Sequence, residues 1–232
     1  MAVEHFGERV LPGKYGLRLT RELYALPNSR RSLPHDRRYF SDAQWEDETR
    51  YFVDADHTIY RPDHVAWLQE RALHNFDLNM AYFARIPQEV FDAALEALLE
   101  RTPQLQPVVN LKELENVEGV YVMVLDQYRQ IYTGKAYEIR QRIRSHWTGT
   151  KQLDRLVFGD VAESVLSIDS FRALDTTRIF AAATENPAEL ETEIEAGFPR
   201  DFALNRIWGG PIDNVVRALL VRAEVKRRRL ID

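Results

Sequence analysis

The stretch from residue 119 to residue 147 constrains the fold more than any other part of the chain. It opens with an apolar run, Val120–Leu125, followed by a polar turn at Asp126–Gln130 and a short second strand, Ile131–Thr133, that ends at Gly134. After Gly134 the spacing of apolar residues changes from the period of two that is typical of strands to the period of about 3.6 that is typical of helices. The residues on the helical face are Ala136, Ile139 and Ile143. The pattern therefore predicts a β-hairpin, a glycine and a helix in direct succession.

This stretch resembles the signature of the GIY-YIG nuclease family. The first half of the signature is present as Gly119-Val120-Tyr121 and the second half as Tyr132-Thr133-Gly134, and the two tyrosines are eleven positions apart. The arginine that the family carries on the following helix matches Arg142, whereas Thr133 departs from the isoleucine of the pattern. The resemblance covers roughly residues 117–205. It implies an α+β fold with a small antiparallel three-stranded sheet flanked by helices.

The resemblance also implies a reaction, the hydrolysis of a DNA phosphodiester bond. Tyr121 is the candidate general base, and Tyr132 would position water or phosphate. A free tyrosine has a pKa near 10, so a neighbouring cation must lower it, and Lys135 is close in sequence. Arg142 would hold the scissile phosphate, because a guanidinium fork fits two phosphate oxygens. His146 lies one helical turn after Arg142 and can act as a proton shuttle or as a donor to phosphate; some restriction enzymes of the family carry a histidine there.

A carboxylate on a late helix is implied to hold one divalent metal ion, Mg²⁺ or Mn²⁺, since oxygen ligands suit these ions. The buried stripe of that helix is marked by Leu190, Ile194 and Phe198. Helical phase relative to this stripe places Glu191 in the metal position. The distance to the asparagine that often follows in the family, here Asn205, points back to Glu193 instead. We therefore expect Glu191 to bind the metal and keep Glu193 as the alternative.

Four further residues are candidates for contact with nucleic acid. They are Gly134, Asn205, Arg140 and Arg144. Arg140 and Arg144 are expected to be surface or DNA-facing charges, and a structural turn role is an alternative for Asn205. Basic charge gathers around the signature, where residues 119–158 contain 7 Lys or Arg against 3 Asp or Glu. Such a concentration favours contact with phosphates.

Composition limits the class of protein. The 232 residues allow one large domain or two small ones. The absence of cysteine excludes disulfides and thiolate-zinc sites. No apolar run approaches the roughly 20 residues that span a bilayer, and the first residues lack the apolar core of a signal peptide. We expect a cytoplasmic protein that does not bind a membrane.

Three parts of the chain are expected. Residues 1–110 form an N-terminal helical extension that supports the core or contacts DNA, with support as the better interpretation. Residues 111–210 form the GIY-YIG-like nuclease core, and residues 211–232 form a basic C-terminal helix. Further elements are expected as helices at Asp63–Phe83 and Pro87–Arg101 and as a third strand at Arg178–Ala183.

These features together predict a metal-dependent endonuclease of the restriction or defence type that acts on double-stranded DNA. Excision-repair members of the family carry further domains for which the chain lacks room, and homing members append a longer DNA-binding tail. Cutting both strands needs two active sites, so a homodimer is expected, and a cognate methyltransferase is a partner that the sequence leaves open. Two other classes stay open. One is a module of a defence or mobile-element complex that binds nucleic acid without cutting it, and the other is a small phosphoester hydrolase unrelated to DNA.

Overall fold

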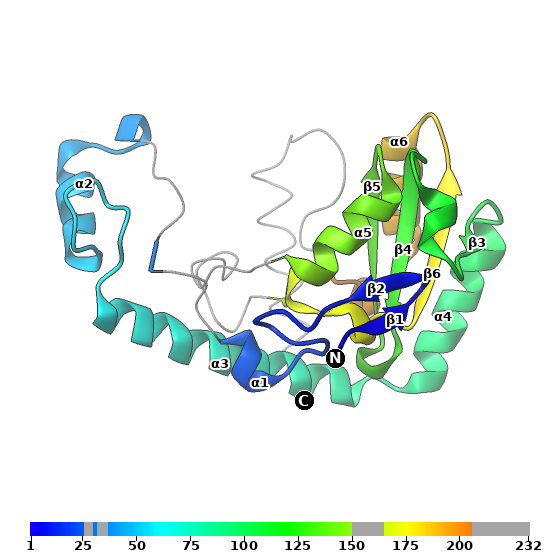
Figure 1. The fold of residues 1–232 in the computed structure, drawn as a ribbon, viewed down its shortest axis with the longest axis horizontal. Helices are drawn as coiled ribbons and strands as arrows, with labels where there is room; N and C mark the ends of the chain where they lie inside the picture. The colour runs from blue at the N-terminus through cyan, green and yellow to red at the C-terminus, as the bar shows by residue number, and fades with distance from the viewer. Residues whose placement is uncertain (26–29, 32–36, 150–164, 206–232) are drawn as a thin grey trace.

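The structure of the chain is a computed structural model that describes residues 1–25, 30–31, 37–149 and 165–205. Within these ranges, helices and two antiparallel sheets form the expected α+β fold (Figure 1). The basic helix expected at residues 211–232 lies outside the described residues. None of the helices in the described ranges is both long enough and apolar enough to cross a membrane.

The main sheet has four strands, so the expected count of three is wrong. The strands lie side by side in the order β3 (Gln106–Pro107), β6 (Arg178–Ala183), β4 (Gly119–Leu125) and β5 (Gln130–Ala136), and every neighbouring pair is antiparallel. The added strand, β3, has only two residues and includes a proline, which a sheet tolerates at its edge. A strand this short leaves no alternating pattern in the sequence. The strand expected at Arg178–Ala183 is confirmed with the same bounds.

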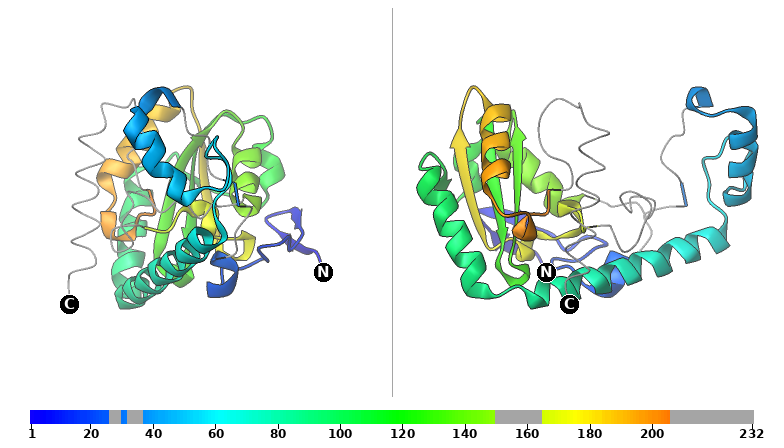
Figure 2. Two further views of the ribbon diagram at one scale, coloured as in Figure 1. Left: turned by 90° about the vertical axis from the view of Figure 1, so that its left-hand side faces the viewer. Right: turned by 180° about the vertical axis from the view of Figure 1, so that it is seen from behind.

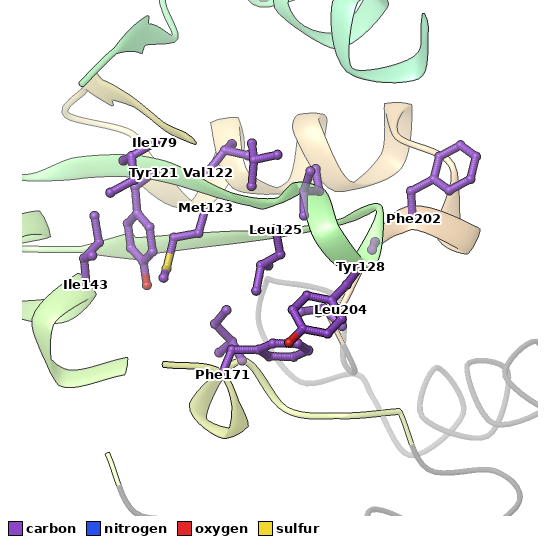
Figure 3. Packing of buried hydrophobic residues seen from close by; sticks show 14 of the residues in the cluster. Tyr121, Val122, Met123, Leu125, Tyr128, Ile143, Phe171, Ile179, Phe202 and Leu204 are labelled. Atoms are coloured by element: carbon purple, nitrogen blue, oxygen red, sulfur yellow. The ribbon is translucent and has the colours of Figure 1, made fainter. Parts of the chain in front are cut away.

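Helices cover both faces of this sheet. α5 (Ile139–Thr148) lies on one face and α6 (Pro187–Gly197) on the other (Figures 1 and 2). Successive side chains of a strand point to opposite faces, and Tyr121 and Met123 of β4 point away from Val122 (Figure 3). Every residue of β4 is buried. The uninterrupted apolar run in the sequence is therefore explained by a strand that is covered on both sides.

The hairpin is longer than the sequence predicts. It closes through a 3₁₀ turn at Asp126–Tyr128, after which Arg129 adopts a left-handed conformation with φ of 49°. Pairing with β4 continues past Gly134 as far as Ala136. The helix consequently starts at Ile139, and Ala136 belongs to the strand and not to the helical face on which it was expected.

The N-terminal region is not purely helical. It begins with a two-stranded antiparallel sheet of β1 (Val3–His5) and β2 (Glu8–Val10), which the sequence does not predict. Two short helices follow, α1 (Arg21–Tyr24) and α2 (Asp42–Glu48). α2 lies at the far end of a long helix, α3 (Pro62–Arg85), away from the main sheet (Figures 1 and 2).

The two helices expected in this region are confirmed as α3 (Pro62–Arg85) and α4 (Gln88–Arg101). Phe91 and Leu95 of α4 are buried in the same apolar cluster as β4. Phe91 also packs edge-on against Phe202, with 5.8 Å between the ring centroids. α4 therefore supports the sheet, and the apolar core continues across the expected domain boundary at residue 110.

Candidate active site

A cavity of about 240 Å³ opens at β5, which is the last strand of the main sheet. Its walls come from β5, α5, α6 and the segments that follow α5 and α6. The lining residues are Tyr132, Arg142, His146, Ser167, Ile168, Asp169, Glu191, Glu195, Leu204 and Asn205. Five residues expected to be functional, distributed over 74 positions of sequence from 132 to 205, thus meet at one cavity.

Tyr121 lies behind the wall of the cavity. Its side chain is 0% exposed, and its hydroxyl oxygen is 2.8 Å from Nε2 of His146. His146 is 2% exposed, and its Nδ1 is 2.6 Å from Oδ1 of Asp169. Side chains from β4, α5 and the 3₁₀ turn at Ile168–Ser170 therefore form one continuous hydrogen-bonded chain.

The two signature tyrosines lie on the same face of the hairpin but are offset along it. Tyr121 is paired with Gly134, and Tyr132 is paired with Met123. The Tyr121 and Tyr132 ring centroids are 6.2 Å apart, and Tyr132 is edge-on to His146 at 5.1 Å. Tyr132 lines the cavity, whereas Tyr121, the expected general base, lies behind its wall. Tyr132 is the phenol that a water in the cavity can meet.

Gly134 is required by the packing of these phenols. A Cβ atom at this position would lie 2.6 Å from Cζ of Tyr121 and 3.0 Å from Cε1 of Tyr132, and it would collide with the Tyr121 hydroxyl. Real Cβ atoms do not approach heavy atoms this closely. The signature glycine is thus explained by the aromatic side chains on its own sheet, without the contact to nucleic acid that was expected of it.

Both phenols hold their protons at neutral pH. Burial raises the pKa of Tyr121 well above its ordinary value, the charge of Tyr132 adds to this effect, and Arg142 opposes it. Burial likewise raises the pKa of Tyr132 to about 12, again against the influence of Arg142. Lys135 was expected to lower the pKa of Tyr121, but its Nζ is 2.6 Å from Oε2 of Glu191. Lys135 therefore neutralises a carboxylate and not a phenolate.

Two acidic side chains of α6 face the cavity. Glu191 is 7% exposed and Glu195 is 5% exposed, and they lie one helical turn apart. Glu193, the alternative metal carboxylate, is exposed to solvent on another side of the helix and does not line the cavity. Glu191 stands on the wall, as helical phase predicts. Glu195 was missed, although its spacing of four from Glu191 was a usable signal.

Asn205 joins α6 to the outer edge of β5. Its Nδ2 donates to Oε1 of Glu195 at 2.5 Å and to the Thr133 carbonyl at 2.7 Å, and its Oδ1 accepts the Thr133 amide at 3.0 Å. The preceding Leu204 donates its backbone amide to the Ile131 carbonyl at 2.8 Å. Asn205 thus occupies edge hydrogen-bonding groups of β5 and holds Glu195 in the cavity wall, which agrees with the structural role considered for it.

The arginines of α5 divide into two groups. Arg142 is exposed and lines the cavity. Arg140 places Nε 2.7 Å from Oε1 of Glu8, and Arg144 places Nε 3.4 Å from Oε2 of the same carboxylate. Neither of the two lines the cavity. Both were expected to be surface or DNA-facing charges; in the structure they form ion pairs that join α5 to β2, and the Arg144 side chain remains 52% exposed.

Asp169 is a second residue that the sequence did not reveal. It follows a stretch without periodic pattern and belongs to a short 3₁₀ turn, so no motif marks it.

The described residues contain no group of three or more His, Asp or Glu side chains arranged to hold a metal ion. No protein-family model matches the chain, and neither a curated protein nor a solved structure is significantly similar to it.

Proposed function

We propose that the chain is a metal-dependent endonuclease that hydrolyses DNA phosphodiester bonds at this cavity with a GIY-YIG-like site. The observation that supports the proposal best is the convergence of Tyr132, Arg142, His146 and Glu191 on one cavity, with Tyr121 directly behind it. A core built for stability alone gains little from gathering charged and polar groups, because each must be desolvated. Such gatherings are typical of functional sites.

Tyr132 is the base in this proposal. Its phenolate form takes one proton from a water molecule, and the resulting hydroxide oxygen bonds to phosphorus. The bond from phosphorus to the leaving oxygen then breaks, and that oxygen takes a proton from solvent. Because the pKa of Tyr132 is about 12, only a small fraction is phenolate at neutral pH. The positive charge of Arg142 acts to increase that fraction.

Arg142 also binds the phosphate. Its guanidinium is exposed at the cavity, so a phosphate from solvent can reach it without rearrangement of the fold. The planar fork donates two parallel hydrogen bonds to phosphoryl oxygens. His146 fixes the hydroxyl of Tyr121 from the other side and packs edge-on against Tyr132, which restricts the position of the base.

The residues of the cavity fit one divalent cation that keeps most of its water. Glu191 supplies a carboxylate on the wall, Glu195 lies one turn away, and the cavity has volume for water molecules. Oxygen ligands and retained waters suit Mg²⁺ or Mn²⁺. Glu191 would hold the ion after exchanging its contact with Lys135. When bound, the ion supplies positive charge that stabilises the phosphoryl and leaving oxygens.

The biological setting is part of the same proposal. A histidine at position 146 resembles some restriction members of the family, which favours a restriction or defence enzyme that acts on double-stranded DNA. Cleavage of both strands then requires two copies of the site, as in a homodimer. A cognate methyltransferase would protect the host DNA of such an enzyme.

Nicking of supercoiled plasmid in Mg²⁺ and in EDTA tests the reaction. We expect cleavage by the wild-type protein in Mg²⁺ only, and a loss on the order of 10²-fold or more in Arg142→Ala, as is typical when a group that stabilises developing charge is removed. Arg21→Ala is a charge-matched control, because Arg21 forms an exposed ion pair with Asp77 and does not line the cavity. Full activity in Arg142→Ala would disprove the assignment.

The same experiment addresses the alternative of binding without cleavage. A gel-shift assay at two salt concentrations measures duplex binding, which must weaken with salt if phosphates are contacted. Salt-sensitive binding without nicking in either Mg²⁺ or Mn²⁺ would favour a non-cleaving module. Hydrolysis of a small phosphodiester without duplex binding would instead favour a phosphoesterase unrelated to DNA.

A further inference from the structure

We propose that Asp169 is a positioning residue that fixes the ring hydrogen of His146 on Nδ1 and so makes the Tyr121 hydroxyl a donor to Nε2. The catalytic consequence of this arrangement rests on the proposed nuclease function. The arrangement itself rests only on the geometry of three side chains. It assigns a role to Asp169, a cavity residue for which the resemblance supplies none.

The direction of the hydrogen bonds follows from the chemistry of the groups. An ionised carboxylate can only accept, and Oδ1 of Asp169 is 2.6 Å from Nδ1 of His146. Nδ1 must therefore carry a hydrogen. In a neutral imidazole the other nitrogen is then an acceptor. Nε2 is 2.8 Å from the Tyr121 hydroxyl, so that hydroxyl donates to the ring.

This direction matters because Tyr121 is fully buried. With its hydrogen directed at His146, the phenol oxygen keeps its lone pairs turned away from the ring, where the positive charge of Arg142 acts to lower the pKa of Tyr121. With the opposite tautomer, Nε2–H would point at the same oxygen and occupy one of these lone pairs. The Tyr121 hydrogen would also need a new acceptor in a place that water does not reach, at a cost of about 1–3 kcal/mol. Asp169 thus fixes the direction of the Tyr121 hydroxyl through the intervening ring of His146.

The fold holds Asp169 firmly against α5. Arg172 is 5% exposed, and its guanidinium donates to the Asp169 carbonyl at 2.6 Å and to the Gly149 carbonyl at 2.7 Å. It also donates to the Trp147 carbonyl at 3.3 Å. One buried side chain therefore links the turn that carries Asp169 to the end of the helix that carries His146. This link keeps the turn and the helix in the positions that the 2.6 Å contact between Asp169 and His146 requires.

A competing role for Asp169 is direct metal binding, because it lines the same cavity as Glu191. The two roles make different predictions for the isosteric change Asp169→Asn. A carboxamide can donate to Nδ1, which moves the ring hydrogen to Nε2 and reverses the tautomer. Loss of a metal ligand would instead leave the tautomer unchanged and raise the Mg²⁺ concentration needed for cleavage.

Long-range ¹H–¹⁵N NMR of the imidazole rings distinguishes these roles. The full chain contains 6 histidines, so the signals of His146 are assigned by their loss in His146→Gln. Spectra are recorded without metal at pH 8, above the ordinary histidine pKa of about 6.5. We expect hydrogen on Nδ1 in the wild-type protein and on Nε2 in Asp169→Asn. Asp77→Asn, which removes an exposed carboxylate outside the cavity, leaves the His146 signals unchanged.

Plasmid cleavage by the same proteins gives the functional readout. We expect a reduction of about 10- to 100-fold in Asp169→Asn, the usual size for residues that orient a catalytic side chain, with an unchanged Mg²⁺ midpoint. Asp169→Glu keeps a carboxylate acceptor, so it retains the wild-type tautomer and recovers part of the activity.

Several results would overturn the proposal. Hydrogen on Nε2 in the wild-type protein would do so without any variant, even if Asp169→Asn fails to fold. An unchanged tautomer in a folded Asp169→Asn, or a shifted Mg²⁺ midpoint, would also do so. If the wild-type protein does not cleave DNA but shows the expected tautomers, the nuclease proposal fails while the arrangement of Asp169, His146 and Tyr121 stands.

Discussion

Replacement of Gly134 by alanine tests the packing from which the whole site is built. The new methyl group would lie within 3.0 Å of atoms in both Tyr121 and Tyr132, closer than folded proteins allow. Overpacking of this kind typically costs about 1–3 kcal/mol, and contacts with two buried rings place the cost in the upper part of that range. The reduced flexibility of alanine in the unfolded chain offsets up to about 1 kcal/mol. We therefore expect a net loss of about 1–2 kcal/mol in the free energy of unfolding.

For a chain of this length, each kcal/mol corresponds to a change of about 2–4 °C in Tm, so Gly134→Ala should lower Tm by about 2–8 °C in differential scanning calorimetry. Gly13→Ala is a matched control, because a Cβ at Gly13 meets no heavy atom within 4 Å. Plasmid cleavage should fall as well, since Tyr121 must leave its contact with His146. In a Tyr121→Phe background the atom with the worst overlap is absent, so the cost of Gly134→Ala should be smaller. Equal Tm values for wild type and Gly134→Ala would refute the packing argument.

Three further predictions follow from the described contacts. The rate of DNA cleavage should rise about tenfold per pH unit from pH 7 to 9. This range lies below the Tyr132 pKa of about 12, so the phenolate fraction of Tyr132 increases with each step in pH. A rate that does not change with pH would exclude Tyr132 as the base. Asn205→Ala should lower the free energy of unfolding by about 1–3 kcal/mol. It should also accelerate amide hydrogen exchange at Thr133, because the Thr133 N–H loses its acceptor. Unchanged exchange at Thr133 would contradict this prediction. Burial lowers the pKa of His5, so its neutral form is favoured in the folded state. The contribution of His5 to the free energy of unfolding is present above pH 6.5 and is lost as the pH falls toward the lowered pKa. In urea titrations, His5→Gln should therefore lose less stability than the wild-type protein when the pH is lowered.

The elements that follow from local periodicity could be predicted from the sequence. The apolar run of β4 and the stripe of α6 are patterns of period two and 3.6, and burial enforces both. The choice of Glu191 over Glu193 came from the same stripe, and Glu195 lies on the same face. The distance from Asn205 points to Glu193, but the side chain that Asn205 contacts is Glu195, because the chain has turned to run along β5 before it reaches Asn205.

Contacts between segments far apart in the sequence could not be predicted in this way. Arg140 and Arg144 share Glu8 as an ion-pair partner, more than 130 positions earlier, in a hairpin too short to leave a pattern. The carbonyl of Asp169 accepts a hydrogen bond from the buried Arg172, whose sequence neighbours carry no motif. In both cases a charge that appears free in the sequence is paired by tertiary structure. A positive run near a motif is therefore weak evidence for a DNA-binding surface.

The position of the cavity at an edge strand follows from the way that edge is covered. An open edge exposes unpaired backbone groups and invites association with other strands. The backbone of Leu204 and the side chain of Asn205 occupy that edge at Ile131 and Thr133. Beyond Thr133 the strand continues with Gly134, at the level of the two phenols. The segment that protects the sheet therefore also sets one wall of the cavity, so a change in this wall should alter stability and any activity at the site together.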